Sequence, residues 1–386
     1  MKIARWMLVV LFFIFLGGVS VAGLVQEDRE KSENENRYLA QVPQISWERV
    51  KSGRFQKDFE EYLNDQIAAR DLWITAKTAV QKAARNTDIG GAYVGKDGYD
   101  FEKITPEDVD EKQVQRNLVA IQDFFSTVGQ KLPKERLSFL LIPTSGYVLS
   151  EKLPAGARLF DQNSYIERAG NSVGEGIFVD VREELRSHKD EPIYYHTDHH
   201  WTTDGAYIAY EKWSKSKGHH FVDRTELTKR IVSENFRGSL YSKILDADSV
   251  YDQIWVYEKK GETPAIDTQY RVTIDGKKEG TLFDFAKLSE KDQYKFFLGD
   301  NYGQVCIENT GTVTGGGNLL VIKDSFANTF VPLIVEEFDR TYMLDLRYYN
   351  GDVQQYIKEH EITEVLVLYN ISNFISDRNL YKLNGI

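Results

Sequence analysis

The sequence contains a single cysteine, Cys306, so the chain can form no internal disulfide. It also lacks a basic stripe beyond its N-terminal tip, and 59 acidic against 48 basic residues give a net charge of −11. Phosphate binding needs concentrated Lys and Arg, so this balance argues against a nucleic-acid function. No internal repeat or low-complexity segment is present. The 386 residues, 41% of them hydrophobic, suffice for one large domain or two smaller ones.

Only the N-terminus carries a long apolar run. Lys2 and Arg5 precede an uncharged stretch at 6–26, which is typical of a signal peptide or an uncleaved signal anchor. Ser20-Val21-Ala22 offers a small-x-small cleavage site, whereas the run approaches the roughly 20 residues that span a bilayer. We expect 1–26 to be a signal anchor that leaves the rest of the chain outside the cell membrane, or a signal peptide cleaved after Ala22.

The next segment, 27–90, is expected to be a linker followed by helix. It starts with polar and charged residues, and at 47–85 apolar residues recur at spacings of three and four. Four glycines between 90 and 98 then interrupt the pattern, and 92–99 reads as a short hairpin with an Asp-Gly turn. The main domain is therefore placed at 91–386.

Within 91–386, apolar runs alternate with helical patterns. The run at 137–142, ended by Pro143, is typical of a buried parallel strand. We expect strands at 137–142, 177–181, 319–322, 342–346 and 365–369, and helices at 114–128, 164–174, 203–217, 326–337 and 353–360. This order predicts an α/β layered domain with a parallel sheet. The polar, turn-rich stretch 236–292 is expected to be an antiparallel insertion.

Two distant motifs contain the parts of a serine-nucleophile site. Ser325 follows an apolar strand and precedes an apolar helix, so its hydroxyl should lie at the carboxyl edge of the sheet, beside free N–H groups of the helix. Asp198 and His200 supply a carboxylate and an imidazole two residues apart. A serine hydroxyl needs such a base, and the base needs an orienting acid. The simpler interpretation of Ser325 is a helix N-cap.

The histidine-rich motif also allows two other interpretations. His196, Asp198, His199 and His200 are all suitable ligands for a divalent metal, with His219-His220 as a further partner. No additional cysteine or acidic cluster with ligand spacing supports that interpretation, and we predict no metal and no cofactor. A buried polar cluster that caps the following helix is the other alternative.

The motif Asp198-His199-His200-Trp201 is followed by Thr-x-x-Gly-Ala-Tyr at 202–207. Further motifs in a fixed order lie at 35–37, 59–70, 94–98, 236–243, 324–326 and 345–348. This pattern resembles the bacterial DHHW surface-protein family, and it is similar to the SGNH-hydrolase-like domains of alginate O-acetylation proteins. The resemblance covers nearly the whole chain and implies an SGNH-like layered catalytic domain at 91–386.

In the alginate O-acetylation relatives, an Asp-x-His motif precedes a Ser in a Gly-Asp-Ser-like motif. Carried over, the resemblance implies Asp198 as orienting acid, His200 as base and Ser325 as nucleophile. Lys323 departs from the pattern, since such motifs often have glycine there. The expected oxyanion donors are the Ser325 backbone and Asn370 at a strand end.

Arg347 follows a strand and should reach the same sheet edge as Ser325, so Arg347 and Tyr348 are predicted to contact the substrate. A surface salt bridge is an equal alternative for Arg347.

The resemblance implies an extracytoplasmic O-acetyltransferase that acts on a cell-surface polysaccharide through an acyl-enzyme. Acetyl-CoA does not occur outside the cell, so a membrane-bound O-acyltransferase is the expected acyl donor, and the N-terminal anchor holds the chain at the membrane. Two alternatives stay open. A carbohydrate acetylesterase would use the same triad, and a non-catalytic polysaccharide-binding or assembly protein would keep only the fold.

Overall fold

The computed structural model describes residues 2–35, 37–261 and 269–385. The described residues do not include Asn36, which belongs to the motif at 35–37, or 262–268, which belong to the expected insertion. The chain divides into two compact units. The first comprises 1–90 together with 241–249, and the second comprises 91–240 together with 250–386.

The first unit is mainly helical. Its elements are α1 (Lys2–Val25), β1 (Lys31–Ser32), β2 (Arg37–Tyr38), α2 (Trp47–Lys51), α3 (Arg54–Gln66), α4 (Arg70–Ala83) and β3 (Asp88–Ile89). Within α1, the segment Arg5–Gly23 is long and apolar enough to cross a membrane. The helical pattern at 47–85 is broken twice, at Gly53 directly before α3 and at Ala69 directly before α4, and both residues take left-handed backbone conformations.

The second unit is built on a seven-stranded sheet in the order β10-β9-β11-β13-β12-β14-β6. Its strands are β6 (Leu137–Ile142), β9 (Tyr270–Ile274), β10 (Lys278–Gly280), β11 (Gln304–Asn309), β12 (Asn318–Lys323), β13 (Arg340–Leu344) and β14 (Glu364–Asn370). Neighbours from β13 to β6 pair in parallel, and β11, β9 and β10 extend the sheet as antiparallel strands. Separate hairpins are formed by β4 (Ala92–Val94) with β5 (Asp100–Glu102) and by β7 (Leu227–Phe236) with β8 (Asp252–Lys259).

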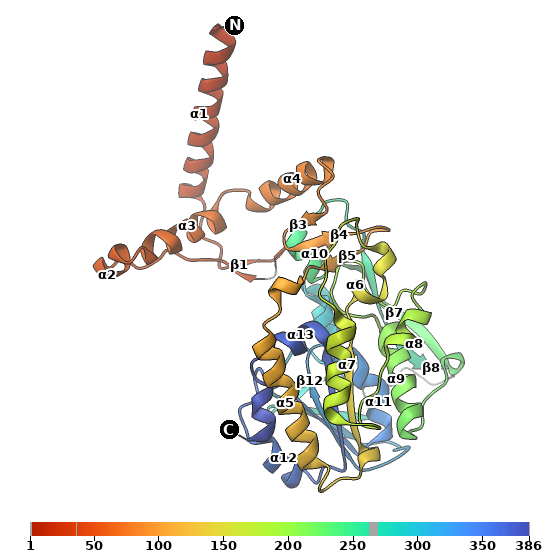
Figure 1. Cartoon of the computed structure of the whole chain (residues 1–386). Helices are drawn as coiled ribbons and strands as arrows, with labels where there is room; N and C mark the ends of the chain where they lie inside the picture. Colours follow the sequence, from red (N-terminus) through yellow and green to blue (C-terminus); the bar gives the residue numbers. More distant parts are fainter. Residues whose placement is uncertain (1, 36, 262–268, 386) are drawn as a thin grey trace. The chain divides into compact units, whose positions relative to one another are not determined.

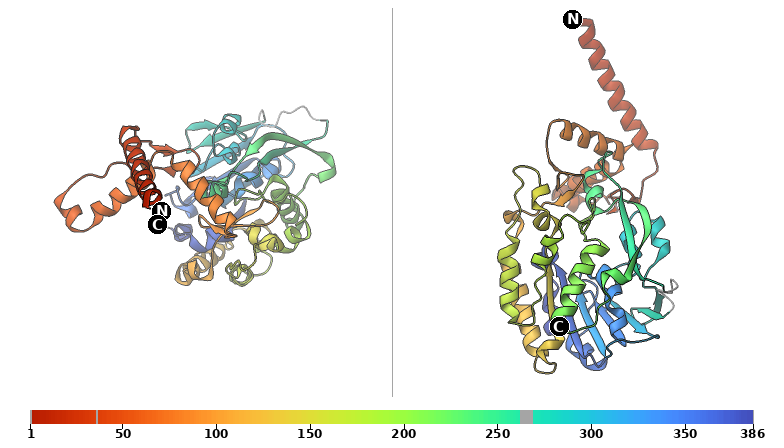
Figure 2. Two further views of the ribbon diagram at one scale, coloured as in Figure 1. Left: turned by 90° about the horizontal axis from the view of Figure 1, so that it is seen from above. Right: turned by 90° about the vertical axis from the view of Figure 1, so that its right-hand side faces the viewer.

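Helices cover both faces of this sheet (Figure 2). Side chains along a strand alternate between faces, so Leu319 and Val321 of β12 enter one core cluster and Leu320 and Ile322 enter the other. The first cluster is completed by α6 (Ser145–Val148), α8 (Arg182–Ser187), α9 (Thr203–Lys217) and α11 (Ala327–Ile334). The second is completed by α5 (Glu111–Val128), α7 (Gln162–Val173), α12 (Val353–Glu359) and α13 (Ile371–Ser376), of which α5 and α7 run side by side in Figure 1.

This architecture confirms the predicted α/β class with a parallel sheet. One expected strand, 177–181, is wrong. This segment lies beside the edge strand β6 and makes only an isolated bridge to it, between Phe178 and Phe139. The antiparallel strands begin at 227 and end at 309, outside the expected bounds of 236–292. The remaining helix, α10 (Ser239–Ile244), contains the point where the chain passes from the second unit to the first.

Candidate active site

Ser325 lies in the turn between β12 and α11, at the carboxyl edge of the parallel strands. Asp324 holds this turn, since its carboxylate accepts hydrogen bonds from the backbone N–H of Phe326 at 2.9 Å and of Asn370 at 2.7 Å. Burial raises the pKa of Asp324. Ser325 is buried, with 8% of the residue exposed.

His200 and Asp198 complete a hydrogen-bonded chain with Ser325. The Ser325 Oγ lies 2.7 Å from His200 Nε2, and His200 Nδ1 lies 2.6 Å from Asp198 Oδ1. The two segments are 125 residues apart in sequence. The hydroxyl, the imidazole and the carboxylate therefore stand in the order and at the distances of a serine triad.

Trp201 fixes the loop that carries this base to the turn that carries the serine. Its fully buried indole N–H donates to the carbonyl of Phe326 at 3.0 Å. The loop is closed by a bridge between Tyr194 and Trp201, and 195–200 lie between them. The tryptophan of the Asp-His-His-Trp motif thus positions His200 against Ser325.

The Asp198 carboxylate is held from its other side by the segment Gly238-Ser239. Its Oδ2 accepts from the backbone N–H of Ser239 at 2.7 Å, and its Oδ1 also accepts from the backbone N–H of His200 at 2.9 Å. A Cβ added at Gly238 would lie 2.3 Å from both the Cβ and Oδ2 of Asp198. This close approach explains why glycine occurs in the motif at 236–243, a role that sequence reasoning missed.

Asp252 organises the start of the same loop, and it too was missed. Its carboxylate accepts from the backbone N–H groups of His196 and Thr197, both at 2.9 Å, and it pairs with His196 Nδ1 at 2.8 Å. The His196 ring also stacks on Tyr99. His196 is therefore committed to this support and is turned away from the triad.

Tyr294 is the closest aromatic neighbour of the base. Its ring stacks on His200 with centroids 3.7 Å apart and planes 9° from parallel. Its buried hydroxyl lies 3.1 Å from the Ser325 carbonyl and 2.7 Å from Thr329 Oγ1. Tyr294 thus braces both the imidazole and the serine turn. It lies in a polar stretch with no local pattern that marks it.

Burial sets the charge states of the pair. It lowers the pKa of His200 below the usual 6.5, and the neighbouring His199 lowers it further, against the opposing effect of Asp198. Burial alone would raise the pKa of Asp198, but the charges of His199 and His200 and its hydrogen bonds hold that pKa well below its usual range. A neutral imidazole beside an ionised carboxylate is the state in which a base can accept the serine proton.

Behind the serine turn, Lys323 and Arg347 share one carboxylate. The buried Lys323 Nζ donates to Asn328 Oδ1 at 2.7 Å and to Asn301 Oδ1 at 2.9 Å, and it lies 3.8 Å from Asp345 Oδ2. Burial lowers its pKa to about 8. Arg347 binds the same Asp345 through Nε at 2.9 Å and through a second guanidinium nitrogen at 2.6 Å.

Arg347 makes the salt bridge that was one of the two interpretations suggested by the sequence. That bridge joins it to Asp345, yet its side chain is 35% exposed at the sheet edge. Its positive charge acts on the triad, where it lowers the pKa of His200. Tyr348 follows with 55% exposure, and the Arg347 guanidinium lies 5.5 Å from its ring centre. Both residues present polar groups to solvent, and the charge of Arg347 reaches His200.

Asn370, the second expected oxyanion donor, uses its side chain elsewhere. Its Nδ2 donates to the Ile142 carbonyl at 3.1 Å, and its Oδ1 accepts from the N–H and hydroxyl of Ser372. The residue is an N-cap for α13 that also ties β14 to β6. The structure therefore does not bring the Asn370 side chain to the Ser325 hydroxyl.

A metal could be held by Asp198, His199 and His200, whose ligand atoms lie within 4.8 Å of one another. His199 Nδ1 lies 2.6 Å from Ser239 Oγ. The nitrogens of His200 and one oxygen of Asp198 already bond to each other and to Ser325, so a cation here would replace the triad contacts. His219, the further metal ligand suggested by the sequence, does not join this group. Its ring nitrogens contact Glu337 and Glu364.

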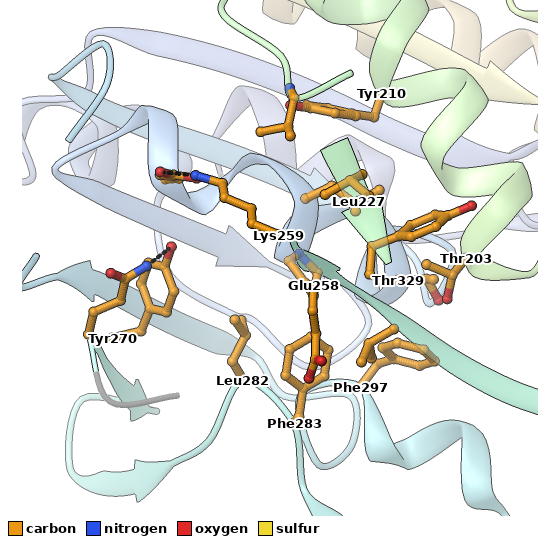
Figure 3. A pocket seen from close by; sticks show the side chains of 17 residues that line it. Thr203, Tyr210, Leu227, Glu258, Lys259, Tyr270, Leu282, Phe283, Phe297 and Thr329 are labelled. Carbon is orange, nitrogen blue, oxygen red and sulfur yellow. Dashed lines mark hydrogen bonds and ion pairs between the residues drawn. The ribbon is translucent and has the colours of Figure 1, made fainter. Parts of the chain in front are cut away.

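A separate cavity of about 140 Å³ is shown in Figure 3. Its walls combine apolar side chains, such as Phe283 and Phe297, with charged ones, such as Glu258 and Lys259. Ser325, His200 and Asp198 are not among its lining residues. Thr329 lines it and connects it to Tyr294 through the hydroxyl contact. The triad chemistry thus belongs to the sheet edge and not to this cavity.

Comparison with known proteins identifies the segment that carries this site. Residues 165–344 match the family model described as DHHW protein. This segment is therefore similar to DHHW proteins. The matched segment includes all three triad residues, and the resemblance inferred from the motif is confirmed. No curated protein sequence matches the chain.

Solved structures share the fold of this chain. A DHHW family protein from Eubacterium siraeum superimposes with a TM-score of 0.62 at 22% identity, over 77% of this chain and 95% of its own. Bacillus cereus PatB1 with a sulfonyl adduct gives a TM-score of 0.61 at 21% identity, over 75% and 98% of the two chains. The O-acetyltransferase domain of Pseudomonas putida AlgJ is more distant, with a TM-score of 0.46 at 14% identity over 74% and 93%.

Proposed function

We propose that the protein is an extracytoplasmic O-acetyltransferase that modifies a cell-surface polysaccharide through a Ser-His-Asp acyl-enzyme. The observation that carries the proposal is the hydrogen-bonded chain of Asp198, His200 and Ser325 at 2.6 and 2.7 Å. These groups come from separate segments and meet at the carboxyl edge of the sheet, where α/β folds bind ligands. A helix cap would need the serine but neither the imidazole nor the carboxylate.

In the first half-reaction, Ser325 Oγ attacks the carbonyl carbon of a donor acetyl ester while His200 Nε2 takes the serine proton. Asp198 holds the Nδ1 proton in place, so that Nε2 stays free to accept, and it stabilises the imidazolium that forms. The tetrahedral intermediate collapses as the donor C–O bond breaks. His200 returns its proton to the leaving oxygen, and acetyl-Ser325 remains.

In the second half-reaction, a sugar hydroxyl attacks the acetyl carbon of acetyl-Ser325. His200 removes the proton of that hydroxyl, the bond from the carbon to Ser325 Oγ breaks, and the proton passes to Oγ. The sugar leaves as its acetyl ester. Water in place of the sugar would give hydrolysis, so the same triad serves a carbohydrate acetylesterase.

The negative oxygen of each tetrahedral intermediate requires hydrogen-bond donors. The Ser325 backbone N–H is the candidate that the turn offers, since it makes no hydrogen bond to any of the described residues. Arg347 and Tyr348 are the proposed contacts for the polysaccharide, because both are exposed to solvent and the charge of Arg347 acts on His200.

The N-terminal helix suggests that the body of the chain lies outside the cell, and the proposed acetyl donor is inferred from that location. Since acetyl-CoA does not occur outside the cell, a membrane-bound O-acyltransferase is the proposed supplier of the acetyl group. Lys2 and Arg5 should hold the N-terminus inside. Protease added to protoplasts should then digest the body of the chain, and a protected body would contradict this location.

Ser325 can be tested directly with a sulfonyl fluoride, which sulfonylates activated serine hydroxyls. The Bacillus cereus relative carries a sulfonyl adduct, which makes this reagent a suitable probe. Peptide mapping should locate one added sulfonyl group on Ser325 of the wild type and none on Ser325→Ala. An aryl acetate should be hydrolysed by the wild type, and Ser325→Ala should lose nearly all of that activity.

The triad members should act as one unit. His200→Ala should lose about as much activity as Ser325→Ala, and the double variant should be little worse. His199→Ala is the matched control, because His199 is the neighbouring histidine but bonds Ser239. Two results would contradict the proposal: wild-type activity in Ser325→Ala, and no sulfonyl adduct on the wild-type protein. Together they would indicate that Ser325 is only a helix cap and would favour a non-catalytic binding protein. Acetyl transfer to the purified polysaccharide in competition with water separates transferase from esterase.

A further inference from the structure

The helix α3 carries an apolar stripe on its outer side. Phe59 and Leu63, one turn apart, are 38% and 53% exposed, and Phe55 stacks on Phe59 with ring centres 5.7 Å apart. The buried residues of this helix are polar instead, namely Asp65 and Gln66. A helix that packs on a soluble core shows the reverse arrangement.

The helix α4 repeats this inverted pattern. Leu72, Trp73 and Val80 are 64%, 38% and 69% exposed. On the opposite side, Thr78 Oγ1 donates to the Ile244 carbonyl at 2.6 Å, and Lys82 pairs with Asp246 at 2.5 Å. Polar contacts therefore hold the helix in its unit while its apolar side chains face outward. Contiguous exposed apolar surface of this kind marks an interaction site.

Contacts tie the two stripes to the apolar helix α1 or to the chain directly after it. The Tyr62 hydroxyl of α3 donates to Asp28, three residues beyond the last residue of α1, Val25. Three extended residues span at most about 11 Å. Trp73 of α4 contacts α1 itself, since its ring centre lies 5.6 Å from that of Phe15. Phe15 belongs to the segment long and apolar enough to cross a membrane.

We propose that α1 is retained as an anchor and that α3 and α4 lie in the outer interface of the lipid bilayer, with these two apolar stripes, Phe59-Leu63 and Leu72-Trp73-Val80, among the acyl chains. Amphipathic helices bind a bilayer in this orientation, and tryptophan favours the interfacial layer. A bilayer is favoured over a protein as the occupant because the α3 stripe is tied to the chain just beyond the spanning helix and the α4 stripe continues onto that helix. The unit would then be a membrane-seated base for the chain.

The arrangement can be measured by site-directed spin labelling of the full chain in liposomes. In a Cys306→Ala background, labels are placed at Val80→Cys and Leu63→Cys. The control is Val119→Cys on α5, an apolar position with 42% exposure in the other unit. Collision rates with oxygen, which enters lipid, and with a water-soluble nickel complex are compared before and after reconstitution.

On reconstitution, nickel collisions at 80 and 63 should fall several-fold while oxygen collisions rise, and position 119 should not change. Full nickel access at 80 and 63 in liposomes would overturn the proposal. Protection that appears only after a second membrane protein is added would overturn it in favour of a protein partner, and a mature chain that begins after Ala22 would also overturn it. Hydrolysis of the aryl acetate, which depends on Ser325, reports on the proposed chemistry independently.

Discussion

Gly238→Ala should disable the triad without replacing any of its three residues. The backbone of Gly238 does not adopt a left-handed conformation, so alanine is compatible with it. The added Cβ, however, would lie 2.3 Å from the Cβ and Oδ2 of Asp198. Nonbonded carbon atoms sit at roughly 3.5–4.0 Å, so the Asp198 carboxylate has to move by about 1 Å.

Such a displacement would break the geometry that orients the base. The Asp198–His200 bond of 2.6 Å would lengthen beyond hydrogen-bond distance, and the 2.7 Å bond from Ser239 would be strained. A misplacement of about 1 Å can cost on the order of 100-fold in rate. This corresponds to about 2.7 kcal/mol of transition-state stabilisation. We therefore expect kcat/KM for an aryl acetate to fall about 100-fold.

The assay compares initial rates and thermal unfolding of Gly238→Ala with those of Gly156→Ala. Gly156 has a φ of +81° and no atom within 4 Å of an added Cβ, so its substitution adds backbone strain away from the site. It should lower Tm with little change in kcat/KM, and so it controls for a general loss of stability. A folded Gly238→Ala enzyme with wild-type kcat/KM would refute the claim that the rate depends on the position of the Asp198 carboxylate.

Three further predictions concern the same site. Because burial lowers the pKa of His200, kcat/KM should begin to fall only below pH 6.5 as the solution is made more acidic. Just below pH 6.5 the unfolded chain binds a proton at His200 and the folded chain does not. The free energy of unfolding, measured by denaturant titration, should therefore also fall as the pH drops from 6.5. Tyr294→Phe keeps the ring on His200 but removes the hydroxyl contacts, and should lower stability by about 1–3 kcal/mol with a small loss of rate, whereas Tyr294→Leu should lose the stack and more of the rate. Exhaustive chelation should leave hydrolysis of the aryl acetate unchanged, and a loss restored by zinc or manganese would instead assign Asp198, His199 and His200 to a metal site.

Local sequence patterns predicted most elements of the main sheet. The apolar run at 137–142 has the bounds of β6, and the helix expected at 203–217 has the bounds of α9. In α9, Thr202 caps the first turn and Gly218 ends the last, so both limits are set by neighbours in the chain. The run at 177–181 was misread because the same apolar residues suit a strand or a buried loop, and pairing decides between them.

The sequence alone determined the residue types available for chemistry and the single apolar helix at the N-terminus, because both depend on composition and short-range spacing. Only the tertiary structure decided which of these groups meet. Packing of the loop against the strand end, through Trp201 and Phe326, brings His200 to Ser325 across 125 residues. The same folding commits Asn370 to a helix cap and places Tyr294 on His200. Contacts between distant segments arise from packing of the whole sheet, and no local periodicity encodes them.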